Sequence, residues 1–130
     1  MKHKNEIKTN PKPMFYAACL EGLRKIALEH GYTLAIHGTL AHDLDLIAVP
    51  WVDCVSEPDE LAEAFWQELA HYCFDGEDRR NTSKFNKEEK GHGRICCTIP
   101  ILGDWYVDLN IINHKLFRIE TGKQIGRAHV

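Results

Sequence analysis

The feature of this sequence that most constrains its fold is a pair of β-rich runs separated by only two residues. The runs cover residues 94–102 and 105–112, and Gly103-Asp104 joins them. Two such runs around a short Gly-containing link predict a β-hairpin. Pro100 has no backbone N–H to donate, so its strand is expected to be an edge strand or to carry a bulge.

Two helices are predicted before this hairpin. From Met14 onward, apolar residues recur at spacings of three and four, and Gly31 follows as a helix stop. A second helix is expected to begin at Ser56 as N-cap, with Asp59 three residues later as its capping-box partner. The apolar faces are formed by Phe15, Cys19, Leu23, Ile26 and Ala27 in the first helix and by Leu61, Phe65, Leu69 and Cys73 in the second.

Between these helices, residues 33–37 and 43–49 have the composition of two short strands. Gly38-Thr39 is predicted to form a turn after the first, and Pro50 to end the second. The apolar residues of the second strand fall on both of its faces. This indicates a central strand that is covered on both sides.

The order helix, strand, strand, helix, strand, strand predicts an α/β (α+β) fold with a small mixed β-sheet flanked by two helices. The length of 130 residues suits one domain. We expect a flexible arm over residues 1–13, a domain over 14–113 and a tail over 114–130, with a long polar loop at 75–91. Residues 124–130 resemble a translated sequencing adapter and are expected to be non-native; the alternative is an ordinary polar tail.

Composition limits the partners and the compartment. The net charge of -3 does not indicate a nucleic-acid or membrane partner, although a local basic patch could still bind nucleic acid. Asp45 and Pro50 break the longest apolar run, which is far shorter than the roughly 20 residues that span a bilayer. The N-terminus lacks the apolar stretch of a signal peptide. The five cysteines include no Cys-x-x-Cys pair, so reduced thiols in a cytoplasmic protein are expected.

The candidate chemistry lies in three aspartates. Asp43 and Asp45 are two residues apart in a strand, so their carboxylates project from one face beside the Gly38 turn. Such a pair can hold hard divalent cations, which prefer oxygen ligands. Asp108 interrupts an apolar strand, where a carboxylate is costly unless it is paired or bound to metal. The alternative interpretation is that Asp43 and Asp45 are solvent-exposed strand-end residues and that Asp108 is a satisfied buried polar residue.

These residues resemble the DNA polymerase β-like nucleotidyltransferase superfamily. The resemblance consists of a strand ending in Gly38-Thr39, a following strand with Asp43-x-Asp45, and one Asp, Asp108, in a later strand. It implies a minimal nucleotidyltransferase-like fold, with Gly38 and Thr39 binding the triphosphate and Asp43 and Asp45 binding Mg²⁺ or Mn²⁺. It also implies that Asp108 is the third metal ligand or the base that activates the attacking hydroxyl.

A second resemblance covers residues 14–113 and is to a group of small, uncharacterised phage-type proteins. The group shares a His-Gly-Ser-x-Ala-x-Asp-x-Asp-Leu-x-Ala-Val-Pro-Trp stretch, which residues 37–51 match with Thr39 in place of the Ser, and His-Gly-Arg before a strand, matched by His92-Gly93-Arg94. This resemblance implies location in the cytoplasm of a bacterial host.

Other residues have both a functional and a structural interpretation. Lys90, His92 and Arg94 surround two glycines and could bind phosphate, or they could be ordinary solvated loop charges. His37 and His42 flank the Gly38 turn and could supplement the site, but a structural role is the simpler reading. Cys96 and Cys97 point to opposite faces of a strand and are expected to fill the core.

Three functions are therefore open. The first is a metal-dependent nucleotidyltransferase that transfers a nucleotidyl group from a nucleoside triphosphate to an unknown acceptor. The second is a degenerate, non-catalytic relative that binds a nucleotide or a protein, which the short segment Leu40-Ala41-His42 between Thr39 and Asp43 favours. The third is an interaction domain that uses the fold only as a scaffold.

Overall fold

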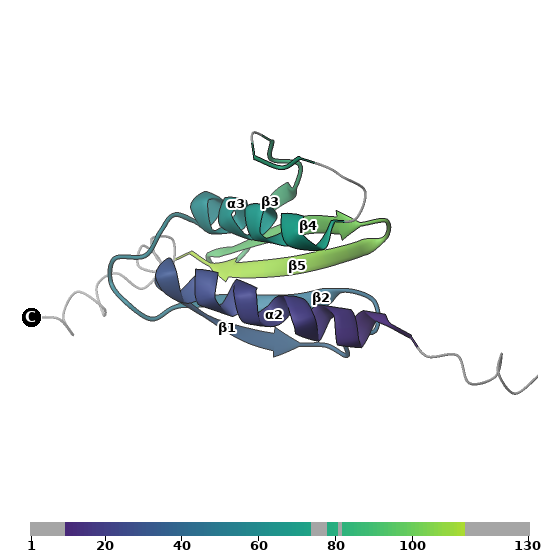
Figure 1. Ribbon diagram of the computed structural model, residues 1–130. Helices are drawn as coiled ribbons and strands as arrows, with labels where there is room; N and C mark the ends of the chain where they lie inside the picture. Colours follow the sequence, from purple (N-terminus) through teal and green to yellow (C-terminus); the bar gives the residue numbers. More distant parts are fainter. Residues whose placement is uncertain (1–9, 74–77, 81, 114–130) are drawn as a thin grey trace, which may run out of the picture.

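The computed structural model describes residues 10–73, 78–80 and 82–113. Most of the predicted arm (1–9) and the whole tail (114–130, with the suspected non-native segment) lie outside the described residues. Figure 1 shows the elements, which follow the chain in the order α2 (Lys12–Glu29), β1 (Tyr32–His37), β2 (Leu44–Pro50), α3 (Pro58–Leu69), the 3-10 turn η1 (Ala70–Tyr72), β3 (Asn86–Lys90), β4 (Arg94–Leu102) and β5 (Trp105–Ile112).

The strands form one mixed sheet in the order β1-β2-β5-β4-β3. The pairs β1–β2, β3–β4 and β4–β5 are antiparallel, and β2 and β5 are parallel. The predicted hairpin of residues 94–112 is confirmed, because β4 and β5 pair antiparallel around the link Gly103-Asp104, where Gly103 adopts a positive φ of 56°. The predicted α+β class with a small mixed sheet and two helices is confirmed.

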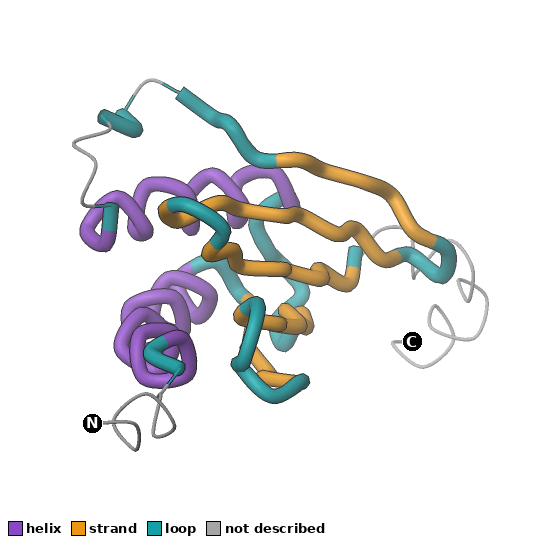
Figure 2. Tube along the Cα trace, turned by 90° about the vertical axis from the view of Figure 1, so that its right-hand side faces the viewer, coloured by secondary structure: helices purple, strands orange, loops and turns teal. Residues whose placement is uncertain are grey.

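Both helices cover the same face of the sheet (Figure 2). In β2 the buried residues alternate with partly exposed ones, so Leu44, Leu46 and Ala48 face the helices while Asp45 and Ile47 face away from them. We call the second face the open face, since no helix of the described ranges covers it. Over the described ranges the prediction that β2 is covered on both sides is therefore wrong, although its place inside the sheet, between β1 and β5, is confirmed.

Helix α2 begins two residues before the predicted start at Met14, with Pro11 as its N-cap. A proline in the first turn loses no hydrogen bond there, so the Pro11-Lys12-Pro13 sequence suits a helix start. The predicted stop is confirmed: Gly31 follows the helix with φ 90°, and a Cβ at this position would lie 2.9 Å from the side chains of Val52 and Val55.

The predicted Ser56 cap of α3 is wrong. The N-cap is Glu57, and it makes no side-chain capping bond. The Ser56 hydroxyl instead lies 2.8 Å from Nδ1 of His30, and its carbonyl accepts a 2.7 Å bond from the Tyr32 hydroxyl. Ser56 thus fixes the loop after β2 to the end of α2, because these tertiary partners compete with the local cap.

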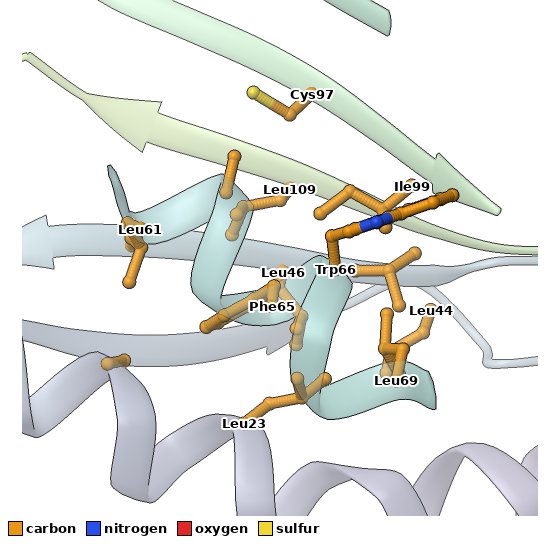
Figure 3. Close-up of a cluster of buried hydrophobic side chains, with 14 of the residues drawn as sticks. Leu23, Leu44, Leu46, Leu61, Phe65, Trp66, Leu69, Cys97, Ile99 and Leu109 are labelled. Atoms are coloured by element: carbon orange, nitrogen blue, oxygen red, sulfur yellow. The ribbon is translucent and has the colours of Figure 1, made fainter. Parts of the chain in front are cut away.

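The core lies between the helices and the sheet (Figure 3). Leu23 of α2 and Phe65, Trp66 and Leu69 of α3 meet the inward residues of the strands, such as Leu46. Burial of each such side chain is worth about 1.5–3 kcal/mol. None of the described helices is both long and apolar enough to cross a membrane.

Strand β3 forms inside the region predicted to be a polar loop. Its sequence, Asn-Lys-Glu-Glu-Lys, has no apolar residue, and all five residues are exposed. It pairs with β4 only as far as Thr98, so Pro100 lies where β4 has no β3 partner, next to a register irregularity between Pro100 and Leu102. Edge strands with charged side chains resist pairing with other chains.

The same region contains a buried cation, Arg79, which is 2% exposed. Its guanidinium lies 3.7 Å from the Trp66 ring centroid and donates to the carbonyls of Pro100 at 2.8 Å, Ile101 at 3.0 Å and Trp66 at 3.3 Å. The bonds to Pro100 and Ile101 satisfy carbonyl groups in the part of β4 that has no β3 partner. Arg79 therefore fastens the segment before β3 to the core.

We expect Arg79→Ala to lower the free energy of unfolding by about 2–4 kcal/mol, because it leaves buried carbonyl groups unpaired and removes the contact with Trp66. Urea denaturation measures this effect. The neighbouring Arg80→Ala is the control, since Arg80 is exposed and its ion pair among the described residues is with exposed Asp78, and its effect should stay within about 0.5 kcal/mol. Equal effects of the two substitutions would contradict this role of Arg79.

Candidate functional site

The parallel pairing of β2 with β5 brings two of the predicted carboxylates together. Asp45 and Asp108 are direct partners in this register, and both project from the open face, where both are half-buried. Their side chains are within hydrogen-bonding contact. Two carboxylates this close cannot both be ionised without a cost, unless a proton or a cation lies between them.

Asp45 also determines what can occupy position 38. Gly38 has φ 80°, and a Cβ placed on it would lie 2.7 Å from Oδ2 of Asp45. The carboxylate of Asp45 therefore lies directly against the backbone of the Gly38 turn. Only glycine combines this backbone conformation with such a close approach.

The surroundings raise the pKa of Asp45 above its ordinary value of 3.8. Burial is the largest cause, followed by repulsion from the carboxylate of Asp108, while Asp43 and the shared hydrogen bond with Asp108 add smaller increases. His37, the partner of Asp45 across β1 and β2, partly offsets them. The local field thus favours bringing positive charge to Asp45.

Helix α2 positions the chain just before Asp43. The Tyr16 hydroxyl donates a 2.7 Å bond to the carbonyl of His42 and accepts a 3.4 Å bond from the backbone N–H of Tyr106 in β5. A buried tyrosine thereby ties the approach to β2 to the start of β5. Asp43 is half-buried in the bend before β2.

The predicted turn at Gly38-Thr39 is confirmed, and it is exposed. The Thr39 hydroxyl accepts a 3.3 Å bond from the backbone N–H of Ala41, and Leu40 adopts a positive φ of 62°. A hydroxyl that accepts one bond keeps its own hydrogen to donate elsewhere. Thr39 can therefore offer this hydrogen to a ligand at the Gly38 turn.

A fourth strand contributes a thiol to the same place. Cys96 of β4 donates from Sγ to Oδ1 of Asp108 at 3.0 Å. Burial, followed by the hydrogen bond to Asp108, raises the pKa of Cys96 to about 12, so the thiol keeps its proton. The prediction that both neighbouring cysteines fill the core is right for fully buried Cys97 and wrong for Cys96, which faces the carboxylates.

The residues that were predicted to bind phosphate lie in two separate places. Gly38 lies against Asp45 and Thr39 follows it in the same turn, whereas Gly91-His92-Gly93 forms the turn between β3 and β4. Arg94 is the partner of Ile112, four residues beyond Asp108 along β5, which corresponds to roughly 13 Å. His92 and Arg94 are exposed, and Lys90 forms a 3.1 Å ion pair with Glu88. The structure does not bring these cations to Gly38.

The site therefore contains part of the predicted set together with residues that were not predicted. Asp45 and Asp108 meet beside Gly38, but in the described ranges no three His, Cys, Asp or Glu side chains are grouped so that they could hold a metal ion. Asp43 as a metal ligand stays a prediction. Cys96 was missed as a partner of Asp108, although its alternation with Cys97 places it on the same strand face as Thr98, opposite Asp108.

Comparison with protein-family models and with curated proteins gives no match. Among solved structures, the chain is similar to the Cid1 poly(U) polymerase with MgGTP bound, at 17% identity and a TM-score of 0.49, over 90% of this chain and 38% of that one. It is also similar to a cytoplasmic RNA terminal U-transferase, at 17% identity and a TM-score of 0.47, over 91% of this chain and 36% of that one. The chain thus spans little more than a third of each. At these scores the likeness carries no conclusion about activity.

The raised pKa of Asp45 predicts how stability depends on pH. Folding favours protonated Asp45, so its contribution is fully present below the ordinary pKa of 3.8 and is lost as the pH rises through the raised value. At pH 7 in EDTA, Asp45→Asn should therefore raise the free energy of unfolding by about 0.2–1 kcal/mol, the scale of side-chain pair interactions between neighbouring strands, because like charges on directly opposed residues are destabilising.

Urea denaturation between pH 4 and pH 8 tests this expectation. Asp104→Asn is the control, since it removes the same charge from a turn side chain that is 84% exposed, and it should change little. A protein with Asp45→Asn that is less stable than the unsubstituted protein at pH 7 would contradict the expectation.

The contact between Gly38 and Asp45 is tested by a matched pair of glycine substitutions. Gly103→Ala places a Cβ at φ 56° in open space, so it should cost only the left-handed backbone energy of about 1–2 kcal/mol. Gly38→Ala carries a similar backbone cost and must also displace the Asp45 carboxylate. Thermal denaturation should show the larger loss for Gly38→Ala; equal losses would show that the carboxylate does not need this space.

Proposed function

We propose that the end of the open face formed by Gly38, Asp45 and Asp108 binds a divalent cation, Mg²⁺ or Mn²⁺, together with the phosphates of a nucleoside triphosphate. The chain is then a metal-dependent nucleotidyltransferase-like protein that transfers a nucleotidyl group to an acceptor yet to be identified. One observation supports this most: two carboxylates from adjacent parallel strands touch on an uncovered sheet face beside a glycine turn.

The donor set suits such an ion. Mg²⁺ is commonly bound through one or two carboxylates, with phosphate oxygens and waters as the other ligands. Asp45 and Asp108 supply the two carboxylates, and Asp43 adds negative charge close enough to act on Asp45. When bound, the ion would neutralise charge on the phosphates during transfer.

The chain's own residues have distinct roles in this proposal. The absence of a side chain at Gly38 lets a phosphate approach the backbone, and Thr39 can donate its hydroxyl hydrogen to a phosphate oxygen. The acceptor hydroxyl forms a bond to the α-phosphorus, the bond to the bridging oxygen breaks, and pyrophosphate leaves with that electron pair. Asp108, besides supplying one of the two metal-binding carboxylates, receives the hydroxyl proton as the base.

Residues outside this end of the face have a separate role. Arg94 lies roughly 13 Å along the strands from Asp108, and His92 precedes it in the turn between β3 and β4. They would therefore contact a more distant phosphate of a bound ligand, because guanidinium groups and exposed glycine-rich backbone both suit oxyanions.

A second function has its own support. Only Leu40, Ala41 and His42 separate Thr39 from Asp43, and the described carboxylates meet as a pair rather than as a group of three. Both features suit a degenerate relative that binds a nucleotide or a protein without turnover. Calorimetry with nucleoside triphosphates and Mg²⁺ separates the two functions: binding without product formation supports the degenerate relative.

The test of the first function is transfer of label from α-³²P-labelled nucleoside triphosphates, with Mg²⁺ or Mn²⁺, to RNA, DNA and protein acceptors. Asp45→Asn should reduce labelling by about 10²-fold or more, the usual scale for loss of a group that stabilises transition-state charge. Asp104→Asn, the exposed control, should label at the unsubstituted rate. Equal labelling by all three proteins, or none by the unsubstituted one, would contradict nucleotidyl transfer to these acceptors.

A further inference from the structure

Cys96 reaches Asp108 along a diagonal of the β4–β5 pair. In the register, Thr98 is directly opposite Asp108, and Cys96 is directly opposite Asn110. The hydrogen bond at Oδ1 nevertheless comes from the Cys96 thiol, 3.0 Å away. Diagonal neighbours on one sheet face lie farther apart than direct partners, and the long C–S bond of a cysteine can cover this distance.

The thiol approaches Asp108 from one side and Asp45 from the other, because β5 lies between β4 and β2. With Oδ1 engaged by Cys96, the side chain of Asp108 is held in one orientation while it also contacts Asp45. A thiol donor has no charge. It therefore restrains the carboxylate and leaves its charge in place, whereas a lysine or arginine at this position would neutralise that charge.

We propose that Cys96 is a positioning residue, whose thiol holds Asp108 in the orientation in which its carboxylate and that of Asp45 together receive a divalent cation. This inference rests on the proposed function. Partners that hydrogen-bond to a ligating carboxylate fix its orientation, and their loss usually weakens metal binding by 10–100-fold. Preorganisation of this kind matters most where few protein ligands hold the ion.

The experiment is titration calorimetry of Mn²⁺ into the full chain. Cys96→Ala removes the donor, and we expect its Kd for Mn²⁺ to rise about 10–100-fold. Cys96→Ser keeps a donor of similar shape and should recover most of the affinity. Cys54→Ala is the control, because Cys54 is an exposed cysteine, and it should bind Mn²⁺ like the unsubstituted protein.

The outcomes separate the inference from the function on which it rests. Unchanged Mn²⁺ affinity in Cys96→Ala would overturn the positioning role and leave the proposed function standing. Equal weakening in Cys96→Ser and Cys96→Ala would also overturn it, since sulfur packing rather than the donated hydrogen would then matter. No Mn²⁺ binding by the unsubstituted protein would overturn both. Thermal denaturation in EDTA confirms that each variant is folded.

Discussion

The parallel pairing of β2 with β5 is the contact on which the rest of the structure depends. It joins the β1–β2 hairpin to the antiparallel β3–β4–β5 unit, so that one five-stranded sheet forms. Its inward residues, such as Leu46 and Leu109, lie in the core beneath both helices. Its outward residues include Asp45 and Asp108, which are direct partners. The same hydrogen-bond ladder that closes the core therefore brings two negative charges together on the other face.

This arrangement is costly for stability and useful for binding. Side-by-side carboxylates repel each other, and partial burial strengthens the repulsion by limiting solvation. A fold selected only for stability would place an uncharged residue at one of these positions. The pair is accompanied by two further features that preserve it: a glycine that gives Asp45 room and a thiol that holds Asp108.

The features that the sequence could predict are those with a strong local signal. The α2 core positions Cys19, Leu23 and Ala27, the stop at Gly31 and the β4–β5 hairpin follow from periodicity and turn residues. Strand β3 lacks such a signal, because a polar edge strand has the composition of a loop. Arg79 was missed for a similar reason, since only tertiary contact with Trp66 and two β4 carbonyls makes a loop arginine a buried residue.

The site was predicted to the extent that alternation along a strand determines it. Asp45 and Asp108 were each assigned to a strand, but their contact depends on a register between strands that are far apart in the chain. No local pattern specifies that register. Cys96 is a different case, because β4 and β5 form the predicted hairpin. Their register follows from the short link and from the irregularity between Pro100 and Leu102, and the bond from Cys96 to Asp108 depends on that irregularity. His92 and Arg94 show the opposite outcome. The Gly-rich segment suggested that they bind phosphate, but the structure places them at the far end of β4, away from Asp45.

The crossover between β2 and β5 has a consequence for how the protein folds. The hairpins join neighbouring segments, whereas the β2–β5 junction closes a long loop of chain that contains α3, β3 and β4, so its closure costs more chain entropy. The contact between Asp45 and Asp108 is therefore absent from every partly folded form in which β2 and β5 are not paired. An ion that binds between Asp45 and Asp108 would therefore stabilise only chains in which β2 and β5 are already paired.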